Sequence, residues 1–189
     1  MNREYLKEIM LDQKEVFLKD RHLVERDIHL EPYIHTSQVV VILGVRRCGK
    51  SSLLFLLKEK MKLSEGDFCY FNFDDERIMR KVEVLEQIDN LHSELYNKEA
   101  ILFFDEIQNI PGWEKFVNRI YEQERKVFVT GSNASLLSSE ISTSLTGRNK
   151  PLNLFPFSFN EYLRFKQLSF DVHFISTKDK IRITGELNP

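Results

Sequence analysis

Residues 44–51 could hold a phosphate group. Their order, Gly-Val-Arg-Arg-Cys-Gly-Lys-Ser, sets two glycines around four residues and follows the second glycine with a lysine and a serine. Residues without a Cβ tolerate positive φ, so successive backbone N–H groups can turn toward one anion. The ammonium of Lys50 would then reach the β- and γ-phosphates of a nucleotide, and the hydroxyl of Ser51 would bind Mg²⁺.

The residues on both sides of this loop predict a strand and a helix. Residues 39–43 form an apolar, β-branched run, which is typical of a buried parallel strand. Residues 52–60 favour a helix, whose unpaired N–H groups and positive dipole end would face the same phosphate. A tight strand-to-helix turn with a chance lysine is the alternative, and the agreement of strand, loop and helix argues against it. The residues predicted to bind nucleotide are Gly44, Val45, Arg46, Arg47, Cys48, Gly49, Lys50, Ser51 and Ser52.

Two adjacent carboxylates, Asp105 and Glu106, follow a second apolar run at residues 101–104. An acidic pair at the end of a buried strand is costly unless a cation lies beside it, and Mg²⁺ on a nucleotide is the natural partner. We predict that Asp105 supports the metal through a water molecule. Glu106 is then placed to orient and deprotonate the attacking water. The alternative is that both carboxylates cap the next turn, which the upstream phosphate-binding loop makes the weaker interpretation.

Further polar residues follow other predicted strands. Ser132 or Asn133, after the strand at 126–130, could hydrogen-bond the γ-phosphate or the attacking water, or could cap the following helix. Arg148 could supply charge to the γ-phosphate, within one subunit or across an interface, or could be a surface arginine. Asp74 and Asp75 end the second strand, where turn capping is favoured over metal contact.

Length and composition fit one globular domain. The chain has 189 residues, 42% of them hydrophobic, and a formal net charge of −2, which argues against a strongly basic nucleic-acid binder. Its cysteines, Cys48 and Cys69, fit reduced thiols of a cytoplasmic protein. The N-terminus is too charged for a signal peptide, and no apolar run is long enough to span a bilayer. We therefore predict a cytoplasmic protein with no membrane partner.

Predicted strands and helices alternate along the chain. This alternation predicts a mainly parallel sheet covered on both faces, with ligands at the carboxyl ends of the strands. We divide the chain into a helical segment (1–30), a core (31–168) and a tail (169–189). Strands are expected at 39–43, 68–73, 100–104, 126–130 and 152–154. Helices are expected at 3–25, 52–60, 84–95, 113–121, 135–141 and 159–166.

Together these motifs resemble the AAA-plus branch of P-loop ATPases, and more narrowly a prokaryotic ATPase family. Its members carry the loop Gly-x-Arg-Arg-x-Gly-Lys-Ser/Thr, then Asp-Asp-x-Arg, Asp-Glu-Ile-Gln, and Gly-Ser followed by Leu-x-Gly-Arg. The segment 155–162 is similar to the family's Pro-x-Ser-Phe-x-Glu-Tyr/Phe. The matching residues here are Gly44–Ser51, Asp74–Arg77, Asp105–Gln108, Gly131-Ser132 and Leu145–Arg148.

The resemblance implies an α/β fold, a P-loop NTPase three-layer αβα sandwich with a mainly parallel five-stranded sheet in the order 5-1-4-3-2. It also implies that Lys50 and Ser51 bind ATP–Mg²⁺, and that Ser132 or Asn133 is the sensor. Arg148 would be an arginine finger that completes the site of a neighbouring subunit in a homo-oligomer. Family members continue into a helical lid and a C-terminal domain, so residues 169–189 would be the truncated start of one of these.

The sequence thus predicts an Mg²⁺-dependent ATPase that uses hydrolysis as a conformational switch. A GTPase would need Asn-Lys-x-Asp, and Asn149-Lys150 begins that motif but Leu152 lacks the carboxylate. A small-molecule kinase would not need Glu106 as a base. A nucleotide-gated module that binds protein or DNA with little hydrolysis stays open, as does the biological process.

Overall fold

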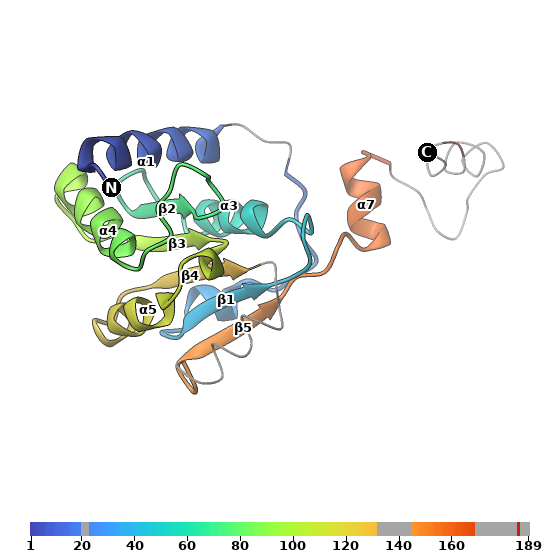
Figure 1. The fold of residues 1–189 in the computed structure, drawn as a ribbon. Coiled ribbons are helices and arrows are strands. Elements are labelled where there is room, and N and C mark those ends of the chain that lie inside the picture. The colour runs from blue at the N-terminus through green and yellow to red at the C-terminus, as the bar shows by residue number, and fades with distance from the viewer. Residues whose placement is uncertain (20–22, 132–144, 169–184, 186–189) are drawn as a thin grey trace. The chain divides into compact units, whose positions relative to one another are not determined.

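The computed structural model describes residues 1–19, 23–131, 145–168 and 185, which form two compact units (Figure 1). The described residues of the first unit lie within Met1–Leu23 and Ile28–Pro156, and those of the second lie within Val24–Asp27 and 157–185. No helix in the described part of the chain is long and apolar enough to cross a membrane.

The first unit is built on a parallel sheet in the order β2-β3-β4-β1-β5. This confirms the predicted fold class and its strand order 5-1-4-3-2. Register pairs bring Phe104 beside Phe71 and Val129, so the carboxyl ends of the central strands meet at one edge. The strands are β1 (Val39–Leu43), β2 (Phe68–Asn72), β3 (Ile101–Asp105), β4 (Val127–Gly131) and β5 (Asn149–Asn153).

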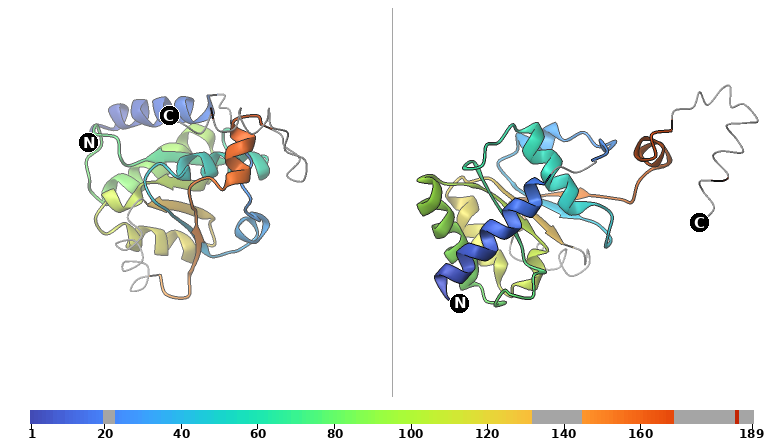
Figure 2. Two further views of the ribbon diagram at one scale, coloured as in Figure 1. Left: turned by 90° about the vertical axis from the view of Figure 1, so that its right-hand side faces the viewer. Right: turned by 90° about the horizontal axis from the view of Figure 1, so that it is seen from above.

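Helices of the first unit lie on both sides of this sheet (Figure 2). Successive residues of β1 face opposite sides: Val41 packs in one buried apolar cluster and Val40 in the other. Helices α4 and α5 supply the first cluster and α3 supplies the second, while α1 contributes to both. Burial on both faces explains why the strands read as continuous apolar runs. The helices are α1 (Arg3–Leu18), α2 (Glu31–Ile34), α3 (Lys50–Lys60), α4 (Glu83–Tyr96), the 3-10 turn η1 (Ile107–Asn109) and α5 (Trp113–Glu122).

Three segments differ from the sequence prediction. Helix α1 ends at Leu18 rather than at residue 25, because Lys19 leaves the helical region and residues 23–26 are not helical. Glu31 begins a single helical turn among residues for which no element was predicted from the sequence; Pro32 is tolerated there because a proline in the first turn forfeits no helix hydrogen bond. Strand β5 begins at Asn149, before the predicted residue 152. Its Pro151 is tolerated because β5 pairs on one side only, with β1.

The division of the sequence at residues 30 and 168 stays a prediction. In the described structure α1 shares its core with the sheet, because Leu6 and Ile9 are fully buried in the first apolar cluster. The predicted helix near 135–141 lies outside the described residues.

The second unit is organised around a buried carboxylate on α7 (Phe159–Phe165), a helix that confirms the one predicted at 159–166. Glu161 accepts hydrogen bonds from the Arg26 guanidinium at 2.9 and 3.3 Å and from the backbone N–H of Asp27 at 2.7 Å. It also closes a capping box with Ser158. Arg26 and Asp27 therefore bond to Glu161, and the helix predicted to run to residue 25 does not reach them.

This carboxylate predicts a specific pH dependence. Burial raises the pKa of Glu161, but the Arg26 guanidinium and two backbone N–H groups outweigh it and lower the pKa to about 2. The ionised group therefore stabilises the folded chain above its ordinary pKa of 4.5, and this stabilisation is lost as the pH falls toward 2. We expect Glu161→Gln to lower the free energy of unfolding at pH 7 by about 3 kcal/mol. In denaturant titrations the difference from the parent should shrink between pH 5 and pH 2; a difference independent of pH would contradict the assignment.

Candidate nucleotide-binding site

The loop between β1 and α3 has the positive φ predicted for its glycines at Gly49 but not at Gly44. Gly49 has φ of 99° immediately before Lys50 begins α3. At Gly44 a Cβ would lie 2.5 Å from the carbonyl oxygen of Leu154 and 2.6 Å from the sulfur of Cys48, so only glycine fits there. The side chains of Arg46 and Arg47 are exposed. That Arg46, Arg47, Val45, Cys48 and Ser52 bind the nucleotide stays a prediction.

Lys50 is buried in the site with its charge held by oxygen atoms. Its Nζ lies 3.2 Å from the carbonyl oxygen of Gly44, 3.3 Å from that of Val45 and 3.4 Å from Oε1 of Glu106. The side chain is 5% exposed. A buried ammonium bound by backbone carbonyls and one carboxylate can exchange these partners for phosphate oxygens of higher charge.

Asp105 ends β3 and is 1% exposed. The hydroxyl of Tyr70 donates to its Oδ2 at 3.1 Å, and the hydroxyl of Thr130 donates to its Oδ1. Burial raises the pKa of Asp105, while the hydrogen bonds from Ser51 and Thr130 act in the opposite direction. A buried carboxylate of this kind gains from a nearby cation.

A hydroxyl and a carboxylate side by side fit Mg²⁺. The Ser51 hydroxyl acts to lower the pKa of Asp105, and both groups are hard oxygen ligands of the kind this ion takes. Within residues 1–19, 23–131 and 145–168, no three His, Cys, Asp or Glu side chains are grouped to hold a metal. An ion here would therefore take its remaining ligands from phosphate and water.

Glu106 follows β3 in the left-handed region, with φ of 54°, and its backbone N–H donates to the Thr130 hydroxyl at 3.0 Å. Its carboxylate lies beside Lys50 and accepts a 2.6 Å hydrogen bond from Nε2 of Gln108. The side chain is 19% exposed, so water can reach it. The structure thus brings Lys50, Ser51, Asp105 and Glu106 together at the carboxyl edge of the sheet.

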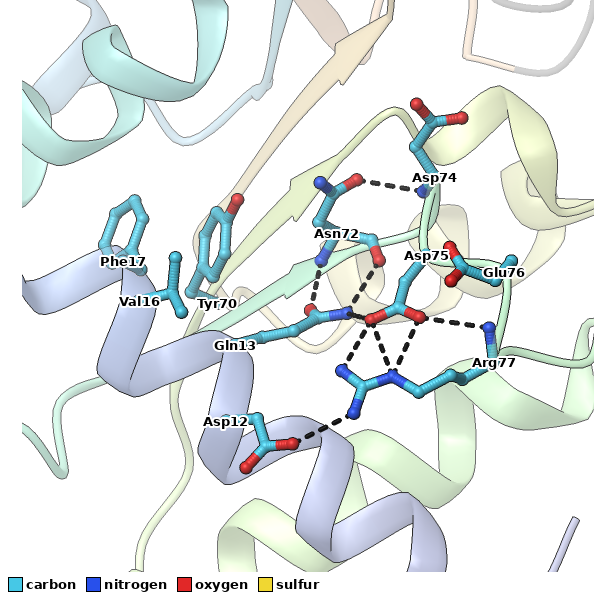
Figure 3. A pocket seen from close by; sticks show the side chains of 10 residues that line it. All are labelled: Asp12, Gln13, Val16, Phe17, Tyr70, Asn72, Asp74, Asp75, Glu76 and Arg77. Atoms are coloured by element: carbon cyan, nitrogen blue, oxygen red, sulfur yellow. Dashed lines mark hydrogen bonds and ion pairs between the residues drawn. The ribbon is translucent and has the colours of Figure 1, made fainter.

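Asp75 lies three residues after the end of β2 and caps a turn. It accepts from the backbone N–H of Arg77 at 3.0 Å and from its guanidinium at 2.8 Å, contacts that lower the pKa of Asp75 to about 2. Arg77 also binds Asp12 of α1, and Gln13 of α1 bonds both backbone groups of Asn72 and the Asp75 carboxylate (Figure 3). These side chains line an acidic pocket of about 480 Å³ beside α1.

Arg148 lies at the opposite edge of the sheet. Its carbonyl oxygen accepts from the N–H of Val39, the first residue of β1, whereas the phosphate-binding loop follows the last residue of that strand. Its guanidinium donates to Asn118 and, at 3.1 Å, to Glu122 of α5. The structure does not bring Arg148 to the loop of its own chain. Ser132 and Asn133 lie outside the described residues.

Tyr70, Thr130 and Gln108 are the site residues that sequence reasoning missed. The available signal was a polar side chain at the end of an apolar run, as at Thr130 after Val127–Val129. Nothing in that pattern indicates which neighbouring strand the hydroxyl would contact.

A family model described as an AAA domain matches residues 36–163. This chain belongs to the AAA domain family. The chain is 37% identical over 96% of its length to an uncharacterized protein of Methanocaldococcus jannaschii, and 30% identical over 77% of its length to one of Haemophilus influenzae. It covers 40% and 39% of those relatives, so it spans about two fifths of their length.

The AAA domain fold also has a solved counterpart. The AMPPCP-bound DnaA of Aquifex aeolicus superposes with a TM-score of 0.51 at 18% identity, covering 84% of this chain and 56% of that one. At this identity the likeness concerns the fold alone.

Proposed function

We propose that this AAA domain binds ATP with Mg²⁺ and hydrolyses it to ADP and phosphate, as a conformational switch. The observation that carries the proposal is the buried ammonium of Lys50, which lies 3.4 Å from Glu106. Lys50 follows a glycine loop at the carboxyl edge of a parallel sheet. Anionic ligands bind at such loop-to-helix junctions because the N–H groups and the helix dipole point at them. The AMPPCP-bound state of the similarly folded DnaA supports a nucleotide as the ligand.

Each charged group has a separate part in the proposed reaction. Lys50 releases the carbonyls of Gly44 and Val45 and binds the β- and γ-phosphate oxygens, where it offsets the charge of the transferring group. Bound beside Ser51 and Asp105, Mg²⁺ would neutralise phosphate oxygens. Glu106 accepts a proton from water as the water oxygen bonds to the γ-phosphorus and the bond from that phosphorus to the β–γ bridging oxygen breaks. Catalysis then rests on position and charge.

The site is completed, in this proposal, by Arg148 of a second copy of the chain. Arg148 lies at the opposite edge of its own sheet from the loop, with a side chain that is 41% exposed and an exposed partner, Glu122. An exposed ion pair of this kind contributes little to folding, so the guanidinium is available to an adjacent subunit. The relatives are longer than this chain, and we assign no protein or DNA partner to it.

Arg148→Ala should therefore lower the rate of phosphate release by about 100-fold and leave ATP affinity unchanged, because an arginine finger acts on the transition state. Arg119→Ala, which removes another exposed arginine paired at 3.3 Å with Glu86, should leave the rate unchanged. An equimolar mixture of Lys50→Ala and Arg148→Ala chains should recover activity, since mixed assemblies contain intact shared sites. Equal rates for Arg148→Ala and the parent would contradict the role.

The proposed function is tested by Mg²⁺–ATP titration of the parent chain at several protein concentrations, with binding and phosphate release measured in parallel. We expect saturable binding and a turnover per chain that rises with protein concentration. Binding without turnover would instead identify a nucleotide-gated binding module.

A further inference from the structure

One hydroxyl contacts both carboxylate residues of the site. Oγ1 of Thr130 donates to Oδ1 of Asp105 and accepts from the backbone N–H of Glu106 at 3.0 Å. Thr130 is completely buried, at 0% exposure. Bulk water therefore cannot replace this hydroxyl as a partner for either residue.

The two contacts match the bonding capacity of a threonine hydroxyl. It has one proton to give to the Asp105 carboxylate and two lone pairs, one of which the Glu106 N–H can use. The last register pair of β3 and β4 is Phe104 with Val129, so Asp105 and Thr130 come next on each strand. Beyond them β3 turns away, with Glu106 at φ 54°, and the Glu106 N–H bonds to this side chain.

We propose that Thr130 is a positioning residue whose single hydroxyl sets both the metal-supporting carboxylate and the water-activating glutamate. This inference rests on the proposed function. The bond to Asp105 fixes the rotation of that carboxylate toward Ser51, and the bond to Glu106 fixes where the backbone leaves the strand. Removal of the hydroxyl leaves a buried donor without an acceptor at Glu106 and a buried carboxylate oxygen with one donor fewer.

Tyr70 provides a matched control, because its hydroxyl bonds to Asp105 whereas the backbone N–H of Glu106 bonds to Thr130. The Tyr70 hydroxyl donates to Oδ2 of Asp105 at 3.1 Å. Tyr70 belongs to β2, which pairs with one edge of β3, whereas Thr130 belongs to β4, which pairs with the other. Tyr70→Phe thus weakens the hold on Asp105 and leaves the bond from Glu106 to Thr130 intact. The two variants separate an effect on metal support from an effect on the base.

The test compares Thr130→Ser with Thr130→Ala, which differ only by the hydroxyl, in the full chain with Mg²⁺ and ATP. We expect the alanine variant to need about tenfold more Mg²⁺ for half-maximal turnover and to show a kcat at saturating Mg²⁺ lower by about tenfold or more. The serine variant should stay within about threefold of the parent on both measures. Tyr70→Phe should raise the Mg²⁺ requirement alone.

Thr130→Val keeps the shape of the side chain by placing a methyl group where the hydroxyl was, and it replaces the alanine variant if that one does not fold. An alanine or valine variant that matches the serine variant in both Mg²⁺ requirement and kcat overturns the proposal. So does a serine variant as impaired as alanine, because the hydroxyl would then not be the determinant.

A second readout separates this proposal from the proposed function. If the parent binds ATP without turnover, the hydrolysis assignment fails, and Thr130 is judged by how Mg²⁺ strengthens ATP binding. An alanine variant that needs about tenfold more Mg²⁺ than the parent for this effect supports the metal-side role, and an equal requirement overturns it. If the parent binds no ATP, both proposals fall.

Discussion

Replacement of Lys50 by alanine is expected to weaken ATP binding by at least about 100-fold, because charge-assisted hydrogen bonds to two phosphates disappear together. The ammonium is buried, and oxygen atoms of the loop and of Glu106 lie 3.2–3.4 Å from it. Among the residues that the structure describes, no other lysine or arginine forms an ion pair with Glu106 or Asp105. Calorimetric titration of ATP into both chains measures the effect.

Lys58→Ala is the matched control for this experiment. Lys58 lies on the same helix and pairs with Glu59 at 2.6 Å, away from the loop that precedes the helix. Its loss should leave ATP affinity within about twofold of the parent, because Lys58 and its partner Glu59 lie near the end of α3 that is farther from the loop. A Lys50→Ala chain that folds and binds ATP as tightly as the parent would remove the main support for a phosphate site.

Glu106→Gln is expected to lower phosphate release by at least about 100-fold and to keep ATP binding, because an amide has the same shape but cannot accept the proton of water. The substitution also removes a negative charge 3.4 Å from the Lys50 ammonium. ATP affinity should therefore equal or exceed that of the parent. Phosphate release and nucleotide binding are measured on the same preparations.

Glu86→Gln serves as the control for loss of a carboxylate. Glu86 lies on α4 and pairs with Arg119 at 3.3 Å, with a side chain that is 57% exposed. Its rate should match that of the parent. Turnover by Glu106→Gln equal to the parent would show that another group activates water.

The order of the strands in the sheet was predicted from the family resemblance. The meeting of Lys50 with the carboxylates was predicted from the residues themselves, because parallel strands end at one edge and each motif follows a strand. The sequence could not predict the contacts of Thr130 and Tyr70, since these depend on which strands lie next to β3 and on side-chain rotation. The position of Arg148 relative to the loop could not be predicted either. Its strand was expected to begin at residue 152, and the actual start at Asn149 places the arginine at the amino edge. The end of α1 at Leu18 depends on tertiary contacts that its own residues do not reveal.

The most direct test of the central claim is a comparison of ATP with AMP as ligands of the parent chain, in the presence of Mg²⁺. The loop amides, Lys50 and Ser51 are expected to bind the β- and γ-phosphates, so ATP should bind with a dissociation constant in the micromolar range and AMP at least about 100-fold more weakly. Equal affinities for ATP and AMP, or no binding of ATP, would contradict the account.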